Sequence, residues 1–444
     1  MLKKIYDISP IFLQNLLISI KGKQLEKERY NKHYYQEFKL LKNNEDSHLL
    51  QKEKLNQFIK YVKNNSTFYN KKLSSLEPPI NIEELKNIEV LHKEDIRKNL
   101  ESIITTNKNL IPLQTGGTTG KSLLVYSNPI DMSKRIAFLD YFKSLHGVEK
   151  GMRRASFTGR SVMSDKQKRK IFWRYNKPLN QKLFSSFHAD GENLKYYIRE
   201  LNKFKPQSID GFTNVIYRIA NYININKIQL EFTPLAIFPT AESLSNPMKE
   251  TIEKAFGCPV RNQYASSEGS PFITECTKGK LHLNIQTGVF ELENIEEDIY
   301  KLYVTSFFTS TTPLIRYDIG DAVKMTGQTC TCGSDCEVVD EIIGRSNDYL
   351  VSRERGRVDA VHLSTIIREA SRKIIESQII QNNLDEIIFK LVIEPGVDIK
   401  EIEQSLYDPF ISRFGSKTSY SVVQVDELEK TDAGKTRFII NNLK

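Results

Sequence analysis

The sequence predicts an α/β protein with a large N-terminal domain built on parallel βαβ units and a small α+β C-terminal domain. Short apolar runs alternate with helical segments between residues 191 and 264, as expected for βαβ units and a parallel sheet. Near Gly344 this alternation gives way to a short series of two helices and two strands. A length of 444 residues is also too great for one ordinary hydrophobic core.

The βαβ region has defined start and stop signals. Helical patterns cover residues 191–204 and Val215–Ile225, and strands are predicted at Ser208–Phe212, Leu235–Phe238 and Pro259–Tyr264. Ser245-Asn246-Pro247 begins a further helix, because proline is tolerated in a first turn, and Gly257 ends it.

Two polar segments follow predicted strands of this region. They are Thr240-Ala241-Glu242 and the run from Ala265 to Gly269. Ligands of parallel sheets bind beyond the carboxyl ends of the strands. The sequence therefore predicts a polar site at this edge of the sheet.

Residues 1–110 are predicted to be a mainly helical part of the large domain, and residues 111–343 its core. Leu55, Phe58, Ile59 and Val62 recur at helical spacing. An apolar patch at Ile11–Ile20 is interrupted by polar residues and is far short of the roughly 20 apolar residues that span a bilayer. We expect it to dock on the protein's own core. The alternative is an amphipathic helix that lies on a membrane surface, assisted by Lys3 and Lys4.

Residues 344–444 are predicted to form a mobile C-terminal domain. We expect a helix at 364–378, an alternating strand at Ile387–Ile393, a helix at 398–413 and a strand at Tyr420–Val425.

The net charge of +9 leaves several classes of partner open. The basic residues are dispersed, however, and no zinc-finger spacing or aromatic RNA-binding signature is present, so nucleic acid is not expected as a partner. No small-residue cleavage site follows the N-terminal apolar patch, which argues against a signal peptide. The odd number of cysteines, five, adds to the prediction of a cytoplasmic protein without a transmembrane segment.

The most specific local feature is a glycine- and threonine-rich loop, which ends in a lysine. Its residues are Thr115, Gly116, Gly117, Thr118, Thr119, Gly120 and Lys121. Glycines let backbone N–H groups approach phosphate oxygens, and threonine hydroxyls and a lysine add donors. A Walker A loop is excluded, because Thr115 stands where that motif needs its first glycine and a strand-like segment follows. Taken alone, the loop is equally typical of a hairpin turn.

Five segments in order along the chain resemble motifs of the acyl-adenylate-forming superfamily. They are the Thr115–Lys121 loop, Gln263–Gly269 (Tyr-Gly-x-Ser/Thr-Glu in the family), Pro313–Asp321 (Arg-Tyr-x-x-Gly-Asp), Gly344–Asp348 (the hinge motif) and Thr431–Arg437 (the C-terminal Gly-Lys motif). Within the superfamily the chain is most similar to the phenylacetate–CoA ligase branch, and to its CapK-like proteins associated with capsular polysaccharide biosynthesis. The N-terminal stretch and the Leu183–His188 segment also resemble that subgroup.

The resemblance implies an enzyme that uses ATP and Mg²⁺ to activate a carboxylic acid as an acyl-adenylate, and then passes the acyl group to CoA. It implies roles residue by residue. Thr115–Lys121 would hold the ATP phosphates, and Glu268 would coordinate Mg²⁺. Thr240, Ala241, Glu242 and Tyr264 would border the adenine, Ser267 would belong to the nucleotide site, and Asp321 would accept hydrogen bonds from the ribose. Arg345 would reach ribose or phosphate, Asn347 would lie at the hinge, and Lys435 would stabilise charge during attack on the α-phosphorus.

Three departures from the family pattern keep other functions open. Ala265 replaces a glycine, Asn347 replaces an aspartate, and a basic segment, Ser352–Arg357, replaces the usual segment after the hinge. One alternative is an adenylating enzyme that passes the acyl group to a sugar amine or a carrier without CoA. The other is a non-catalytic scaffold of a glycan-assembly complex.

Cysteine and histidine residues also form a candidate structural zinc site. Cys276, His282, Cys330 and Cys332 could supply four ligands, with Cys336 as a substitute ligand, and similar placements occur in the phenylacetate–CoA ligase branch. The spacing is not the usual Cys-x₂-Cys, so a set of reduced thiols without metal remains the alternative.

Overall fold

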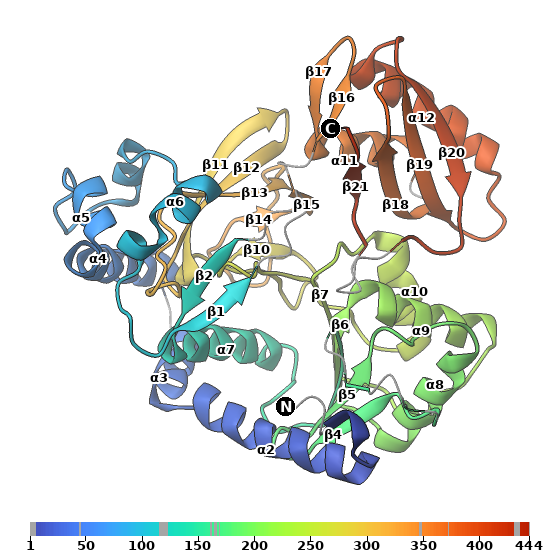
Figure 1. Ribbon diagram of the computed structural model, residues 1–444, viewed down its shortest axis with the longest axis horizontal. Coiled ribbons are helices and arrows are strands. Elements are labelled where there is room, and N and C mark those ends of the chain that lie inside the picture. The colour runs from blue at the N-terminus through green and yellow to red at the C-terminus, as the bar shows by residue number, and fades with distance from the viewer. Residues whose placement is uncertain are drawn as a thin grey trace.

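The computed structural model describes residues 6–43, 46–114, 123–159, 162–163, 167, 169–345, 349–371, 373–429 and 436–443. Figure 1 shows a large body made of helices and several sheets, with a smaller group of strands and helices above it. The predicted α/β class with a parallel sheet in the large part is confirmed. None of the helices among the described residues is long and apolar enough to cross a bilayer.

The N-terminal region is mainly helical, as predicted. Its elements are α2 (Ile11–Arg29), α3 (Lys32–Lys42), α4 (Ser47–Asn65), α5 (Thr67–Lys72), the 3₁₀ turn η1 (Ile82–Asn87) and α6 (Lys93–Ile103). The apolar face predicted on α4 is buried. It belongs to one hydrophobic core with strands from residues 273–323, so the N-terminal helices are an integral layer of the large body.

The parallel sheet has the order β4-β5-β3-β6-β7. It contains β3 (Arg154–Thr158), β4 (Trp173–Asn176), β5 (Gln181–Ser185), β6 (Ser208–Phe212) and β7 (Ala236–Thr240), of which only β4 runs antiparallel. The turn η2 (Gly191–Asn193), α8 (Leu194–Phe204), α9 (Thr213–Ile225) and α10 (Asn246–Phe256) connect and cover it. The predicted ends of α10 are confirmed, because the Ser245 hydroxyl accepts the Met248 N–H and Gly257 closes the helix at φ +65°.

The predicted strand Pro259–Tyr264 does not join this sheet as a full strand. Only Val260 makes a parallel bridge, to Ile237. Gln263–Tyr264 forms the short strand β8, which pairs with β9 (Ile273–Glu275) in a separate antiparallel sheet. The chain therefore turns away from β7 immediately after Val260, and this turn carries Tyr264 toward the neighbouring sheets.

Two antiparallel sheets and a hairpin complete the large body. One sheet has the order β14-β10-β9-β8 and the other β11-β12-β13-β15. The remaining elements are β1 (Ile111–Gln114), β2 (Leu124–Ser127), α7 (Pro129–Ser144), β10 (Leu281–Leu283), η3 (Ile285–Thr287), β11 (Gly288–Glu296), β12 (Ile299–Ser306), β13 (Tyr317–Lys324), β14 (Val338–Val339) and β15 (Glu341–Arg345).

Residues 349–443 have a hydrophobic core of their own. The elements are β16 (Tyr349–Ser352), β17 (Gly356–Asp359), α11 (Ala360–Ala370), β18 (Ile374–Gln381), β19 (Glu386–Ile393), α12 (Ile399–Phe414), β20 (Ser419–Gln424) and β21 (Ile439–Asn441). The predictions for β19, α12 and β20 are confirmed. The helix predicted at 364–378 is wrong beyond Ala370, because the β-branched residues from Ile374 onward form β18, which pairs with β19 and β21.

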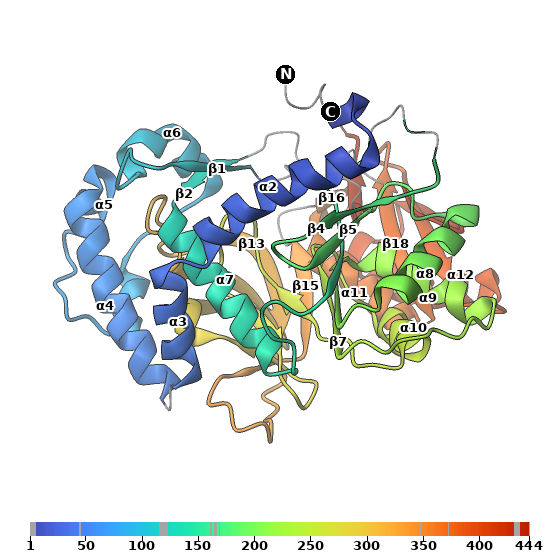
Figure 2. The same ribbon diagram turned by 90° about the horizontal axis from the view of Figure 1, so that it is seen from below.

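Helix α2 differs from the expectation in the way it docks. It lies along the outside of the molecule beside β4 (Figure 2). Gln14 and Gly22 are its buried residues, whereas Phe12, Leu16 and Ile20 are exposed. Phe12, Leu16 and Ile20 of the patch Ile11–Ile20 therefore face outward, whereas Ile11 and Ile18 are half-buried beside Gln14.

Candidate active site

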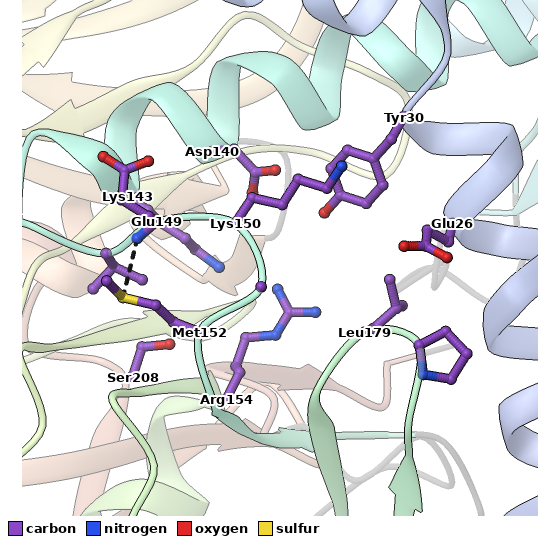
Figure 3. A pocket seen from close by; sticks show the side chains of 13 residues that line it. Glu26, Tyr30, Asp140, Lys143, Glu149, Lys150, Met152, Arg154, Leu179 and Ser208 are labelled. Carbon is purple, nitrogen blue, oxygen red and sulfur yellow. Dashed lines mark hydrogen bonds between the residues drawn. The ribbon is translucent and has the colours of Figure 1, made fainter.

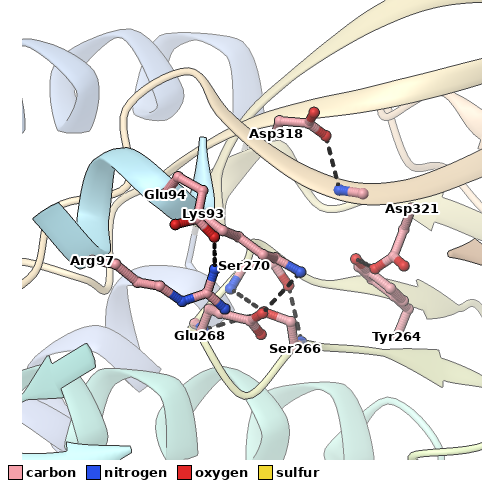
Figure 4. A network of polar contacts seen from close by, with 11 residues as sticks. Lys93, Glu94, Arg97, Tyr264, Ser266, Glu268, Ser270, Asp318 and Asp321 are labelled. Carbon is pink, nitrogen blue, oxygen red and sulfur yellow. Dashed lines mark hydrogen bonds and ion pairs between the residues drawn. The ribbon is translucent and has the colours of Figure 1, made fainter. Parts of the chain in front are cut away.

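The candidate site lies where β8, β13 and α6 approach one another (Figure 4). The loop after β8 is held in a fixed shape by serine side chains. Ser266 Oγ accepts the backbone N–H groups of Gly269 at 3.2 Å and Ser270 at 3.0 Å, and Ser270 Oγ accepts the Ser266 N–H at 3.0 Å. Gly269 adopts φ +104°, and an added Cβ would lie 2.7 Å from Thr309 Cγ2, so the position requires glycine.

This loop presents Glu268, whose side chain is buried. The amine of Lys93, in the first turn of α6, lies 3.9 Å from Glu268 Oε1, which is an ion-pair distance but too long for a direct hydrogen bond. Arg135 on α7 donates to the Ser270 carbonyl at 3.0 Å. Burial lowers the pKa of Arg135 to about 10, while Asp131 and Glu268 oppose that change. The positive charges of Lys93 and Arg135 therefore lie near Glu268. Separately, the carboxylate oxygens of Glu268 are ligands of the kind that a hard cation such as Mg²⁺ prefers.

Tyr264 and Asp321 are joined by a direct hydrogen bond. The Tyr264 hydroxyl donates to Asp321 Oδ2 at 2.6 Å, across from β8 to β13. Burial, followed by the Asp321 charge, raises the pKa of Tyr264 well above its usual value. The tyrosine therefore remains protonated and acts as a donor, which holds the carboxylate in one orientation.

A second carboxylate, Asp318, lies on the same strand, β13, three positions before Asp321. Asp318 accepts a hydrogen bond from Lys301 at 2.9 Å and from the Gly320 N–H at 3.0 Å, and the His92 ring lies 3.4 Å away. Asp318, Lys301, Lys93 and Arg135 were not among the site residues predicted from the sequence. Of these four, Asp318 could have been predicted from the sequence, because it lies within the Pro313–Asp321 motif that also contains Asp321.

The Thr240-Ala241-Glu242 segment follows the carboxyl end of β7, as predicted. Ala241 has φ +69°, a left-handed conformation that is uncommon for alanine. Glu242 Oε2 accepts the Asn214 N–H at 2.9 Å in the first turn of α9. The Asn214 amide also donates to Thr436 Oγ1 at 2.8 Å, so the segment that follows Lys435 contacts the large body beside this loop.

Several predicted site residues lie outside the described residues. These are the phosphate loop from Thr115 to Lys121, Asn347 and Lys435. The backbone of Arg345 is described and pairs with Asp321 in the register of β13 and β15. Ser267 is exposed on the loop next to Glu268. The structure thus brings together Tyr264, Glu268 and Asp321 from separate motifs.

The four predicted zinc ligands converge in a separate cluster. The ligand atoms of Cys276, His282, Cys330 and Cys332 all lie within 4.8 Å of one another. The His282 ring approaches the Cys336 carbonyl through Nδ1 at 2.8 Å, which leaves Nε2 directed to Cys332 Sγ at 3.5 Å. This arrangement fits tetrahedral zinc with an oriented histidine. Cys336, the substitute ligand, is not part of this cluster: its thiol contacts Asp335, and its carbonyl oxygen lies against His282 Nδ1.

A cavity of about 80 Å³ lies elsewhere, between α2, α7 and the start of β3 (Figure 3). Arg154 and Ser208, the first residues of the parallel strands β3 and β6, line it. Lys143 and Arg154 both approach Asp210, at 3.1 and 3.5 Å. The cavity is therefore at the amino ends of the parallel strands, on the opposite edge from Glu242.

Residues 350–442 match the family described as the CapK C-terminal domain. Protein CapK of Staphylococcus aureus is 51% identical to the chain over 449 residues and covers 100% of both sequences. The phenylacetate-coenzyme A ligase of Thermus thermophilus is 22% identical over 243 residues, which is 51% of each chain.

Solved structures of a ligase have the same fold. A 2-hydroxyisobutyryl-CoA ligase in its postadenylation state, with an acyl-AMP, superimposes with a TM-score of 0.65 at 15% identity over 88% of each chain. The same ligase in its thioesterification state gives a lower TM-score of 0.54 at 16% identity over 89% of each chain. The full-length identity to Protein CapK, together with the match at residues 350–442, shows that the chain belongs to the CapK family.

Proposed function

We propose that the chain uses ATP and Mg²⁺ to convert a carboxylic acid into an acyl-adenylate and then transfers the acyl group to CoA. The observation that carries the proposal is the convergence of Tyr264 and Asp321, joined at 2.6 Å, with the buried Glu268. These residues come from two separate motifs and form one polar site. An acid-activating ligase needs such a site to position a nucleotide and its metal ion.

The proposed roles follow from the contacts. Asp321, held by Tyr264, accepts hydrogen bonds from the ribose hydroxyls. Glu268 holds Mg²⁺, which would neutralise phosphate charge when it is bound. The Thr240-Ala241-Glu242 segment and Tyr264 border the adenine. Attack of a carboxylate on the α-phosphorus needs positioning and charge stabilisation rather than a protein nucleophile.

The phosphate loop, Arg345, Asn347 and Lys435 complete the proposal. Thr115–Lys121 binds the ATP phosphates, and Lys435 stabilises the charge that develops at the α-phosphorus. Residues 344–444 rotate as a unit about the hinge at Asn347, so that adenylation and acyl transfer use the same site in turn. The Asn214–Thr436 contact supports this, because it places the neighbour of Lys435 beside Glu242.

A pyrophosphate-release assay over a panel of carboxylic acids, with and without CoA, tests the proposal. We expect release with a subset of acids and thioester formation when CoA is present. Asp321→Asn should lower kcat/KM at least tenfold, whereas Asp385→Asn, which alters an exposed pair with Arg353, should leave it unchanged. Tight ATP binding without pyrophosphate release for any acid would refute adenylation and favour a scaffold.

The identity of the acyl acceptor is decided by the same assay. CoA-independent release, with accumulation of the adenylate and no thioester, would favour transfer to a sugar amine or a carrier. The test includes this second function because the basic segment Ser352–Arg357 replaces the usual segment after the hinge. It forms the β16–β17 hairpin, and Arg353 pairs with Asp385 at 2.7 Å.

We also propose that Cys276, His282, Cys330 and Cys332 bind one structural zinc ion. The metal would tie the Cys330–Cys332 segment to β10, which carries His282. The cluster is separate from the Glu268 site, so no catalytic step is assigned to it.

A further inference from the structure

Helix α2 is attached to the protein through polar and small residues. Gln14 accepts a hydrogen bond from the buried Arg174 at 2.6 Å, and Asn15 accepts the Tyr175 N–H at 3.0 Å. Gly22 lies so close to Asn176 that an added Cβ would be 1.8 Å from its amide oxygen. These contacts fix the rotation of the helix on β4, and the half-buried Ile11 and Ile18 lie on the same side of α2 as Gln14.

The opposite side of α2 carries a stripe of large apolar residues. Ile8, just before the helix, is 74% exposed, and Phe12, Leu16 and Ile20 are 74%, 53% and 60% exposed. Each residue follows the previous one by four positions, so within α2 they lie along one face. Single exposed apolar residues need no explanation, but a contiguous exposed stripe marks an interaction surface.

Two basic residues continue this face in the C-terminal half of α2. Lys23 and Lys27 are exposed there, and Lys23 also pairs with Glu26 at 2.9 Å. Lys21 is exposed as well, but it lies seven positions after Gln14 and therefore on the other side of the helix. The sequence from Ile8 to Leu25 contains no aspartate or glutamate. An apolar stripe followed by lysines is complementary to acyl chains beneath a layer of negatively charged head groups.

We propose that α2 lies in the surface of a membrane rich in anionic phospholipid, with Phe12, Leu16 and Ile20 inserted and Lys23 and Lys27 against the head groups. The proposal is independent of the reaction catalysed at the Glu268 site. In Figure 1 α2 runs along the lower side of the molecule and β16–β21 lie at the top. A membrane at α2 therefore leaves the C-terminal elements free to move.

Vesicle sedimentation with the full-length protein tests the proposal. We expect binding to vesicles of phosphatidylcholine and phosphatidylglycerol, weaker binding to phosphatidylcholine alone, and weaker binding at high salt. The combined variant Phe12→Ser, Leu16→Ser and Ile20→Ser should lose about tenfold or more of its vesicle partitioning. Lys23→Gln and Lys27→Gln together should remove the preference for phosphatidylglycerol.

A matched control replaces three exposed apolar residues elsewhere, Leu49→Ser, Ile225→Ser and Tyr407→Ser. This variant should bind vesicles as the wild type does. An unchanged thermal unfolding midpoint of each variant shows that it folds, which is expected because α2 is attached through Gln14, Asn15 and Gly22. Phe12→Trp gives a second readout, since Trp173 is the sole tryptophan of the wild type. Brominated lipids should quench the added tryptophan more than Trp173.

Three results would overturn the proposal. The first is that the wild type fails to bind anionic vesicles. The second is that the variant with serine at Phe12, Leu16 and Ile20 binds them as well as the wild type does. The third is that the wild type self-associates without binding vesicles while that variant is monomeric, which would assign the stripe to a second copy of the chain.

Discussion

Glu376 on β18 gives a pH-dependent prediction for the contact between the C-terminal elements and the large body. Its pKa is raised from an ordinary 4.5 to about 7, first by burial and then by the charges of Glu242 and Glu427, while Arg218 opposes the rise. Two of these groups, Glu242 and Arg218, belong to the large body, so the carboxyl group titrates at the interface. Arg218 also pairs with Glu427 at 3.0 Å, and Ser245 donates to the Ile375 carbonyl at 3.2 Å across the same interface.

The sign and the magnitude follow from this pKa. A carboxyl group with a raised pKa in the folded state is penalised once it ionises. The penalty is absent below the ordinary pKa, grows between pH 4.5 and about 7, and is complete above pH 7. At about 1.4 kcal/mol for each pKa unit, it reaches roughly 3 kcal/mol. Glu376→Gln removes the charge and should therefore stabilise the protein at pH 8, with little effect near pH 4.5.

Thermal unfolding of the full chain at several pH values measures this effect. We expect the midpoint of Glu376→Gln to exceed that of the wild type by roughly 3–6 °C at pH 8, and the difference to vanish toward acidic pH. Glu403→Gln, an exposed substitution on α12, serves as the control and should show no difference at either pH. A Glu376→Gln midpoint at pH 8 equal to or below that of the wild type would refute the reasoning.

Three further predictions concern the sites. Tyr264→Phe removes the 2.6 Å donor to Asp321 and should cost about 1.5–3 kcal/mol in unfolding free energy, measured by denaturant titration; an unchanged value would mean that the bond is not formed in solution. Gly269→Ala, at φ +104°, places a Cβ 2.7 Å from Thr309 and should cost about 1–3 kcal/mol more than Gly151→Ala, at φ +90° in open space; equal costs would exclude the clash. Elemental analysis should find about one zinc per chain, lost in Cys276→Ser and retained in Cys258→Ser; a metal-free wild type purified without chelator would contradict the site.

The parts of the fold that were predicted correctly have strong local signals. The strand Ser208–Phe212, and the start and stop of α10, follow from apolar runs, proline and glycine. The prediction of a helix was wrong for residues 371–378, because repeated isoleucine pairs are compatible with either a buried helix or a strand. Pairing with β19 and β21, distant in sequence, decided between them.

In the candidate site, too, residues with a local sequence signal were predicted and residues positioned by distant contacts were not. Glu268, Tyr264 and Asp321 were found because each lies in a recognisable motif. Lys93 was not found, because it comes from a helix 175 positions before Glu268, and no local pattern distinguishes it from other lysines at a helix start. For α2 the sequence left a docked helix and a surface-lying amphipathic helix open, because it does not tell which side of the helix meets β4.

The ties between the N-terminal helices and β13 bear on how the chain can be shortened. Arg316, at φ +49°, directs its guanidinium to the Lys86 and Ile88 carbonyls, and Leu91 bridges to Tyr317. These contacts hold the chain just before α6 against β13, and Lys93 at the start of α6 lies 3.9 Å from Glu268. A shortened chain that begins at residue 111 would thus lack one side of the candidate site as well as a layer of the core. The N-terminal quarter of the sequence cannot be exchanged as an independent module.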